Sequence, residues 1–307
     1  MKERRDRITH VFAGNPLDRG EVERRDEEWL TAQAGDPSSL MLPMWQLNVP
    51  VSGDHALTWM PPEEVLRLNV EAEPIFLGLL DGVSHFVIDV SSVERGDIER
   101  DGITFEDART TAEYMSGTDS GIVAQARAQL SWHSRHGFCA VCGHPTHIAR
   151  GGQVRRCAEC GTEHYPRTDP VVITVVHDGE RCLLGQSRGR LVAMRRYSAL
   201  AGFMDQGESI EEAVAREVME EAGIQVGPVR YHSSQPWPFP SSLMIGCHAD
   251  AATTDIHFDP EEMADVQWFT RDEVRLALEE RSEILAIPGP TAIAHHLIRA
   301  WANGEVG

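Results

Sequence analysis

The sequence predicts an α/β protein of the α+β type, in which a small mixed N-terminal domain and a zinc ribbon precede a larger domain with a mixed sheet between helices. Two observations predict this arrangement. Two C-x-x-C pairs lie fourteen residues apart near the middle of the chain, and after them β-branched runs alternate with helical patterns. At 307 residues the chain is long enough for more than one core. We expect domains at 1–134, 135–166 and 167–307.

Short apolar runs separated by turn signals make up the N-terminal domain. A helix is expected near 21–34, and apolar residues on one side indicate another at 110–133. An Asp81-Gly82 turn folds the last of the expected strands back on itself. These strands are expected at 40–51, 56–60 and 74–90.

Four cysteines follow, in two pairs whose spacing is typical of a zinc ribbon. Each pair can form a tight knuckle that presents two thiolates, and Gly143 and Gly161 suit the turns after the pairs. Four thiolates leave no open position for water, so one structural zinc ion is expected. Disulfides are disfavoured in a cytoplasmic chain, and a redox motif needs only one pair. The ligands are Cys139, Cys142, Cys157 and Cys160.

Strands and helices alternate after the ribbon, and a loop that runs into a short helix at 202–224 lies among them. This alternation favours a mixed sheet between helices. The strands are expected at 171–176, 181–185, 243–249 and 267–269, and the helices that close the chain at 271–280 and 292–302.

The helix within 202–224 carries an unusual set of acids. Glu217 and Glu221 lie four residues apart on one face, with Glu220 beside them. Like charges at this spacing repel, and the last turn of a helix disfavours carboxylates. An oxygen-rich cluster of this kind suits magnesium or manganese, whose charge removes the repulsion. Ser209 is expected to cap the start of the helix.

The stretch 202–224, GFMDQGESIEEAVAREVMEEAGI, resembles the Nudix box and matches it at every defining position. The resemblance implies an α/β/α sandwich that holds two or three magnesium or manganese ions against a diphosphate. It implies that Arg216 pairs with Glu208 to brace the loop. The implied metal ligands are the carbonyl of Ala201 and the carboxylates of Glu217 and Glu221. The implied catalytic acids are Glu217, Glu220 and Glu221, and either Glu220 or Glu221 acts on the attacking water.

A second motif indicates the substrate. Residues 234–242 read SQPWPFPSS, a stiff segment that suits a wall beside a planar ligand. This segment, the cysteine spacing and the Tyr-Pro after the ribbon resemble the NADH pyrophosphatase branch of Nudix hydrolases. Members of the branch cleave NADH or NAD to AMP and nicotinamide mononucleotide, and are implicated in removing NAD caps from RNA 5′ ends. They are homodimers.

The resemblance to this branch implies further site residues. Tyr165 and Phe203 would stack on a base or on nicotinamide, and Ala294 would contact the substrate through its backbone. Glu262 matches an outlying metal-binding acid, and its neighbour Glu261 is the alternative. The dinucleotide site would be lined by Gln235, Pro236, Trp237, Pro238, Phe239, Pro240, Ser241 and Ser242.

Composition limits the partners and the location. The net charge of −20 argues against broad binding to nucleic acid or membranes, but it leaves room for a local basic channel. The charged N-terminus lacks an apolar core, and the longest apolar run, 171–176, is too short to span a bilayer. We therefore expect a cytoplasmic protein. Lys2 is the only lysine, which excludes Walker-type phosphate loops and Schiff-base enzymes.

Three other functions remain as alternatives. Within the same chemistry, the substrate could be ADP-ribose or a dinucleoside polyphosphate. Residues 185–189, GQSRG, fit the G-x-S-x-G nucleophile elbow of serine hydrolases, although no convincing buried helix follows. The chain could also be a non-catalytic zinc-ribbon protein that binds nucleotides, but such proteins usually lose an acid of the box.

Overall fold

The computed structural model describes residues 10–53, 56–99 and 102–306, which form two compact units. The N-terminal unit contains Val11–Thr168 and Trp237–Ser241. The C-terminal unit contains His10 and the described residues of 169–236 and 242–306. The division into three domains remains a prediction. Among the described helices, none has both the length and the apolar character that a membrane span requires.

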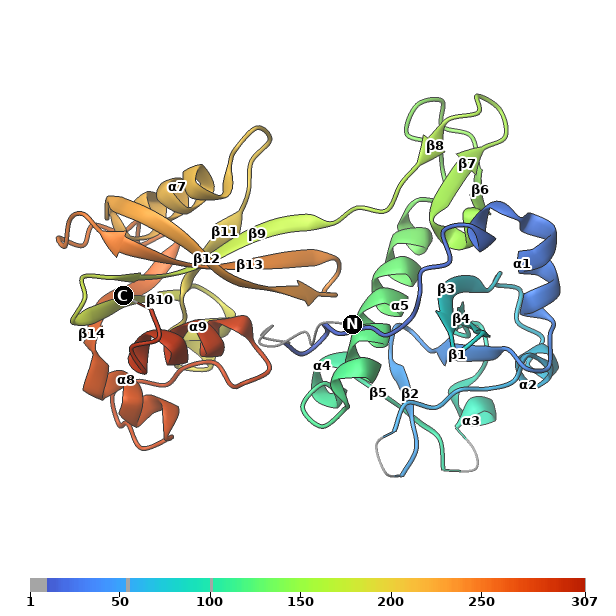
Figure 1. Cartoon of the computed structure of the whole chain (residues 1–307), viewed down its shortest axis with the longest axis horizontal. Coiled ribbons are helices and arrows are strands. Elements are labelled where there is room, and N and C mark those ends of the chain that lie inside the picture. The colour runs from blue at the N-terminus through green and yellow to red at the C-terminus, as the bar shows by residue number, and fades with distance from the viewer. Residues whose placement is uncertain (1–9, 54–55, 100–101, 307) are drawn as a thin grey trace. The chain divides into compact units, whose positions relative to one another are not determined.

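A three-stranded sheet forms the centre of the N-terminal unit (Figure 1). Its middle strand, β4 (Val83–Asp89), is parallel to β1 (Leu40–Met44) and antiparallel to β3 (Ile75–Leu80). Asp81 and Gly82 both have positive φ angles, so the expected tight turn joins β3 to β4. This unit also contains β2 (Val49–Val51), α2 (Pro62–Arg67), α3 (Arg95–Ile98) and β5 (Thr104–Glu106).

Capping residues give helix boundaries that differ from the expected ones. The helix expected at 110–133 is two helices, α4 (Ala108–Thr111) and α5 (Gly117–Arg135). Asp107 caps the first, and Ser116 caps the second by accepting a hydrogen bond from a backbone N–H of its first turn. Because each cap starts a new helix, the prediction of one continuous helix at 110–133 was wrong.

The same reason applies to the helix expected near 21–34. It consists of a short 3-10 helix, η1 (Glu23–Arg25), and α1 (Glu27–Ala34). Asp26 separates them, because its extended backbone ends the first and its side chain accepts a hydrogen bond from Trp29 N at 2.9 Å. The strand expected at 40–51 is likewise interrupted, and that at 56–60 forms only isolated bridges.

The ribbon is a small antiparallel sheet of β6 (Thr146–Ala149), β7 (Val154–Cys157) and β8 (Glu163–His164). A 3-10 turn, η2 (Arg150–Gly152), joins its first two strands. Arg24 lies beneath this turn and donates to the carbonyl of Gly151 at 3.0 Å. The guanidinium also donates to carbonyls of β3, so the ribbon is attached to the central sheet of this unit.

The C-terminal unit is built on a six-stranded mixed sheet with the order β12-β13-β9-β10-β14, and β11 pairs with β9 as well. β13 is parallel to β9, while β10 is antiparallel to both β9 and β14. The strands are β9 (Asp169–His177), β10 (Arg181–Ser187), β11 (Leu200–Phe203), β12 (Val226–Trp237), β13 (Ser242–Ala251) and β14 (Met263–Thr270).

Helices cover both faces of this sheet, α7 (Ile210–Ala222) on one and α8 (Arg271–Leu278) and α9 (Ile293–Ala302) on the other (Figure 1). Alternate residues of β9 supply the two cores: Val172 packs in the core with α7, and Ile173 in the core with α9. The expected α/β/α sandwich with a mixed sheet is therefore confirmed. The short α6 (Arg190–Ala193) follows β10.

One strand of this sheet was not expected. β12 has few apolar residues and includes Pro236, so its sequence gives no strand pattern. It lies at the edge of the sheet, where a proline is tolerated because one side of the strand needs no partner. The first four residues of SQPWPFPSS therefore belong to this edge strand.

Candidate active site and zinc site

Helix α7 presents the acidic residues, and both of its ends are fixed locally. Ser209 caps the helix as expected and forms a capping box with Glu212: Glu212 N donates to Ser209 Oγ at 3.2 Å, and Ser209 N donates to Glu212 Oε2 at 2.7 Å. Gly223 ends the helix with a φ of 69°, and a side chain there would clash with the backbone of His257. These caps set which way the acids of α7 point.

Arg216 ties the loop before α7 to the helix. Its Nε and Nη2 donate to the two carboxylate oxygens of Glu208 at 2.6 and 2.9 Å, which is the bidentate pair implied by the sequence. Its Nη1 donates to Glu217 at 2.7 Å and to Glu220 at 3.1 Å. The hydrogen bonds that Arg216 donates to Glu208 lower the pKa of Glu208 to about 2. Arg216 thus orients two of the expected catalytic acids.

Glu217 lies against the start of the loop. Its residue surface is only 9% exposed, and a Cβ built on Gly202 would overlap its carboxylate. The first glycine of the box is therefore required for a close approach rather than for a special backbone angle. Burial raises the pKa of Glu217.

Glu221 is buried more deeply, with 6% of its surface exposed. Its Oε2 accepts a hydrogen bond from Ala201 N at 3.1 Å. Burial, with the charges of Glu217 and Glu262 as lesser causes, raises the pKa of Glu221 to about 8. Carboxylates that resist ionisation in this way fit divalent cations, whose charge stabilises the ionised form.

Glu262 belongs to a turn before β14, where its N–H donates to the carbonyl of Asp259 at 3.1 Å. Its charge raises the pKa of both Glu217 and Glu221, so this part of the chain faces the same site. The alternative, Glu261, uses its own N–H to bond the side chain of Asp259 at 2.8 Å. That Glu262 rather than Glu261 is the outlying metal ligand remains a prediction.

The four cysteines lie together at the tip of the ribbon. Cys142 Sγ is 3.5 Å from Cys157 Sγ and 3.4 Å from Cys160 Sγ, and Cys139 Sγ is 3.6 Å from Cys160 Sγ. Zinc–sulfur bonds of about 2.3 Å in a tetrahedron place the sulfurs roughly 3.8 Å apart, so the set fits zinc. Within the described residues, no other three His, Cys, Asp or Glu side chains bring ligand atoms within 4.8 Å of one another.

Gln235 is engaged inside the C-terminal unit. It is 1% exposed, its Nε2 donates to Thr291 O at 2.9 Å, and its Oε1 accepts from Ile293 N at 2.8 Å. Gln235 therefore accepts a hydrogen bond from the first residue of α9, the helix that carries the buried Ala294. Its contact with the substrate remains a prediction.

Trp237–Ser241 pack within the N-terminal unit. The ring of Phe239 lies edge-on to Phe12 at a centroid distance of 5.6 Å, and the guanidinium of Arg109 is 4.2 Å from its centroid. Arg127 Nε donates to Pro238 O at 2.9 Å. Pro236 and Ser242 lie on either side, in the ends of β12 and β13, and Pro240 follows Phe239 through a cis peptide bond.

Two aromatic rings expected to stack on the substrate are accessible. Tyr165 and Phe203 are each 61% exposed. Tyr165 donates its hydroxyl hydrogen to Glu163 Oε2 at 2.7 Å, which fixes one end of the ring. Phe203 ends β11, two residues after Ala201. Their role in stacking remains a prediction.

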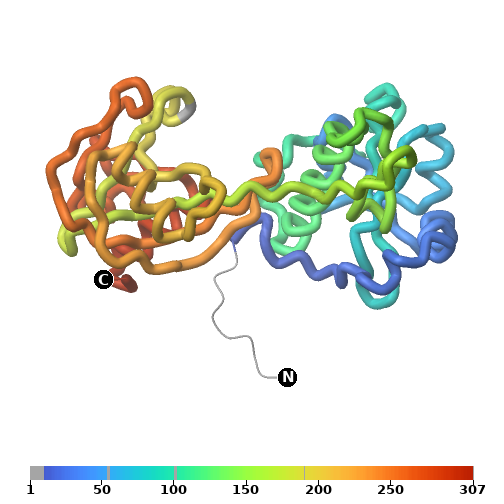
Figure 2. Tube along the Cα trace, turned by 90° about the horizontal axis from the view of Figure 1, so that it is seen from above, coloured from blue at the N-terminus to red at the C-terminus, as the bar shows by residue number. Residues whose placement is uncertain are grey.

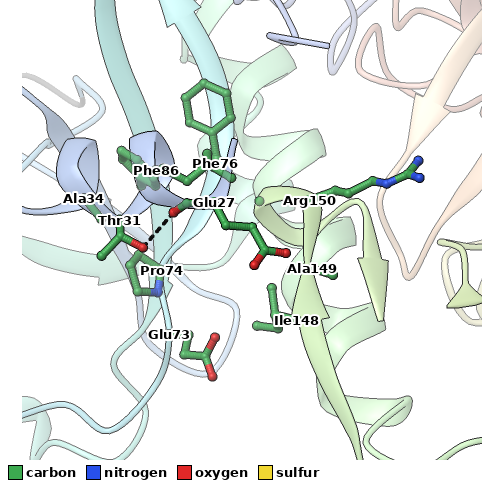
Figure 3. A pocket seen from close by; sticks show the side chains of 12 residues that line it. Glu27, Thr31, Ala34, Glu73, Pro74, Phe76, Phe86, Ile148, Ala149 and Arg150 are labelled. Atoms are coloured by element: carbon green, nitrogen blue, oxygen red, sulfur yellow. Dashed lines mark hydrogen bonds between the residues drawn. The ribbon is translucent and has the colours of Figure 1, made fainter. Parts of the chain in front are cut away.

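The N-terminal unit has a separate pocket of about 320 Å³ (Figure 3). Its lining includes the buried apolar Leu30 and two exposed acids, Glu27 and Glu73. Its one basic lining residue, Arg150, is 3.9 Å from a carboxylate oxygen of Glu163. A diphosphate would be repelled by the two acids, and none of the expected site residues lines the pocket. We therefore do not assign the dinucleotide to it.

Comparison with known proteins gives the family. Three family models match the chain: an NADH pyrophosphatase-like rudimentary NUDIX domain at 38–132, an NADH pyrophosphatase zinc ribbon domain at 134–165 and a NUDIX domain at 167–286. The human NAD-capped RNA hydrolase NUDT12 is 36% identical over 339 residues, which cover 95% of this chain and 73% of the relative. The chain belongs to the Nudix hydrolase family, in its NADH pyrophosphatase branch.

Two further relatives agree with this placement. NAD-capped RNA hydrolase NudC of Mycobacterium bovis is 39% identical over 94% of this chain and 93% of its own. The mouse mitochondrial NAD(P)H pyrophosphatase NUDT13 is 41% identical over 69% of this chain and 64% of its own. The resemblance stated from the sequence is confirmed, and the protein is a Nudix hydrolase with a zinc ribbon.

The serine-hydrolase alternative finds no support in this Nudix structure. Ser187 pairs with Met263 as the last residue of β10, at an irregularity in the ladder. A nucleophile elbow instead needs a sharp turn from strand to helix and a histidine beside the serine. In the described part of the chain, Ser187 has no hydrogen bond to a histidine.

Sequence reasoning missed Arg188. Its Nε donates to Pro260 O at 2.6 Å, and its backbone N donates to Glu262 O at 3.2 Å. It therefore holds the turn that carries the outlying acid. The signal that could have found it is the concentration of arginines at 188–196 in an otherwise acidic chain.

Proposed function

We propose that this Nudix hydrolase cleaves the pyrophosphate bond of NADH and NAD to release AMP and nicotinamide mononucleotide, and that it also removes NAD caps from RNA 5′ ends. The observation that carries the proposal is the buried pair Glu217 and Glu221 against the backbone of Ala201 and Gly202. The relatives named NAD-capped RNA hydrolase and NAD(P)H pyrophosphatase support the choice of substrates.

Magnesium or manganese would be held by Glu217, Glu221 and Glu262 and by the carbonyl oxygen of Ala201. When bound, two or three such ions neutralise charge on the diphosphate and acidify the attacking water. Arg216 keeps Glu217 in position by a hydrogen bond of 2.7 Å. Glu220, whose side chain is half exposed, and Glu221 are the two candidates to take the proton from this water.

The remaining contacts belong to the same proposal. Tyr165 and Phe203 would stack on the bases, Ala294 would offer its backbone, and the segment from Gln235 to Ser242 would line the dinucleotide site. We also propose that the protein is a homodimer, that each chain holds one structural zinc ion, and that the protein is cytoplasmic.

Product analysis tests the proposal. Purified protein is incubated with NADH and magnesium or manganese, with ADP-ribose and diadenosine polyphosphates in parallel, and the products are separated by chromatography. We expect AMP and reduced nicotinamide mononucleotide to form fastest. Cleavage of the other nucleotides with NADH left intact would keep the Nudix chemistry and overturn the substrate.

A further inference from the structure

The segment 188–197, RGRLVAMRRY, joins β10 to β11 and is called the arginine loop below. It contains four arginines and no acid, in a chain whose net charge is −20. None of the expected metal ligands, stacking residues or dinucleotide-lining residues lies in it. The positive charge of this loop is therefore not used by the chemistry proposed above.

Backbone hydrogen bonds hold the loop in shape. Arg196 N donates to Leu191 O and Arg195 N donates to Val192 O, both at 3.0 Å. The next residue, Tyr197, is fixed to a neighbouring segment, because its backbone N donates to Ala286 O at 2.8 Å. A loop held in this way presents its side chains to a ligand without a large loss of conformational entropy on binding.

Two arginines of this loop have no side-chain partner in the described part of the chain. Among the described residues, the side chains of Arg195 and Arg196 make no hydrogen bond and no ion pair, and Arg195 is exposed. Other arginines of the C-terminal unit are paired with acids: Arg181 with Asp178, Arg230 with Asp250, Arg275 with Asp272 and Arg281 with Glu279. Arg195 and Arg196 thus place two charges next to each other without an acid partner among the described residues, beside the exposed Val192 and Met194.

The arginine loop is joined at both ends to segments of the metal site. At its start, Arg188 binds the turn that carries Glu262, and the two loops lie side by side (Figure 2). At its end, Arg196 precedes Ala201 by five residues, and this length of chain spans at most roughly 17 Å. A strand of nucleic acid that leaves the metal site therefore comes within reach of these arginines.

We propose that the arginine loop binds the phosphates of the single-stranded RNA that follows an NAD cap, through Arg195 and Arg196. This inference rests on the proposed function, because it requires NAD-capped RNA to be a substrate. The acidic remainder of the protein repels a polyanion, so RNA needs a local positive surface to approach the metals. Met194 and Val192 supply apolar contact for the first bases.

The test compares NADH with a ten-nucleotide single-stranded RNA that carries a 5′ NAD cap, for the wild type and for R195A/R196A. We expect the double variant to lose about tenfold in kcat/KM on the capped RNA and to keep its kcat/KM on NADH within about twofold. For single strands the logarithm of affinity falls by about 0.7 per phosphate contact for each decade of salt. The salt dependence for capped RNA should therefore become shallower by about 1.4.

R275A is the matched control, since Arg275 is an exposed arginine on α8. α8 begins after Thr270, which pairs with Arg181 at the far end of β10 from the arginine loop. The R275A variant should keep the kcat/KM of the wild type on both NADH and the capped RNA. NADH turnover also reports that each variant is folded and holds its metals, so a folding defect cannot imitate the expected result.

Each other outcome has a defined meaning. Equal turnover of capped RNA by R195A/R196A and wild type overturns the inference, and so does an equal loss on both substrates, which would place the loop in the metal site itself. A wild type that cleaves NADH but not capped RNA overturns the inference and leaves the NADH pyrophosphatase proposal standing. A wild type that cleaves neither substrate contradicts the proposed function first.

Discussion

The carboxylate of Glu217 occupies the space that a side chain on Gly202 would fill. Helix α7 and strand β11 can therefore approach closely enough for Glu217 and Glu221 to lie against the backbone of residues 201 and 202. The capping box and Gly223 fix the helix, and Arg216 fixes the loop, so the acids have little freedom to move away.

Replacing Gly202 with alanine should lower kcat/KM for NADH at least about a hundredfold, because a displacement of about 1 Å at a catalytic group has an effect of this size. The Cβ forces Glu217 out of position. Gly289→Ala is the control, since a Cβ there meets nothing within 4 Å. Initial rates with NADH give the comparison, and full activity in Gly202→Ala would contradict the placement of Glu217.

Replacing Glu221 with glutamine should abolish turnover and leave the fold and the zinc content intact. Magnesium or manganese binds the folded site and not the unfolded chain, so either ion should raise the Tm of the wild type by several degrees. The variant should show a clearly smaller rise. Differential scanning calorimetry with and without EDTA measures this, and an equal metal-induced rise in both proteins would argue against Glu221 as a ligand.

His248 gives the C-terminal unit a dependence on pH. It is 1% exposed and, within the described residues, neither ring nitrogen has a hydrogen-bond partner. Burial, with the charges of His232, His177 and Arg230 and against that of Asp250, lowers the pKa of His248 to about 3. The unfolded chain therefore takes up a proton first as the pH falls below about 6.5, and stability is lost between there and about pH 3.

By pH 5, His248 should account for about 2 kcal/mol of lost unfolding free energy relative to pH 7. His248→Leu should show a correspondingly smaller loss in urea unfolding at the two pH values. The exposed His147 provides the control, and His147→Leu should follow the wild type. Parallel pH curves for His248→Leu and wild type would show that the folded protein protonates His248 as readily as the unfolded chain does.

Cys157→Ser should lose the zinc and destabilise the ribbon, because the remaining three thiolates no longer form a closed tetrahedron. The metal content measured by mass spectrometry should fall from one zinc per chain to nearly none. Cys182→Ala is the control, since Cys182 is a buried core residue away from the ribbon, and it should keep its zinc. Retention of one zinc in Cys157→Ser would refute the four-cysteine site.

The parts of this fold that could be predicted from sequence depend on neighbours along the chain. The caps of α7, the turn at Asp81-Gly82 and the cysteine knuckles are local signals, and the structure contains each of them. Where the prediction failed, local signals were overlooked, as at Ser116, or absent, as along β12.

The parts that could not be predicted depend on contacts between distant residues. Gln235 bonds residues more than fifty positions away, and Arg188 holds a turn seventy-two positions away. No spacing in the sequence marks either contact. The acids of the box could be found because Glu217, Glu220 and Glu221 lie on one helix, whereas SQPWPFPSS is divided between the two units.

The membership of Trp237–Ser241 in the N-terminal unit has a practical consequence for anyone who trims this protein. A fragment that begins at Asp169 contains every acid of the metal site, yet it removes Phe12, Arg109 and Arg127, the partners of Trp237 and Phe239. Two large rings would then face water at the tip of a hairpin. Inactivity or aggregation of such a fragment would report this exposed tip, and not a missing catalytic group.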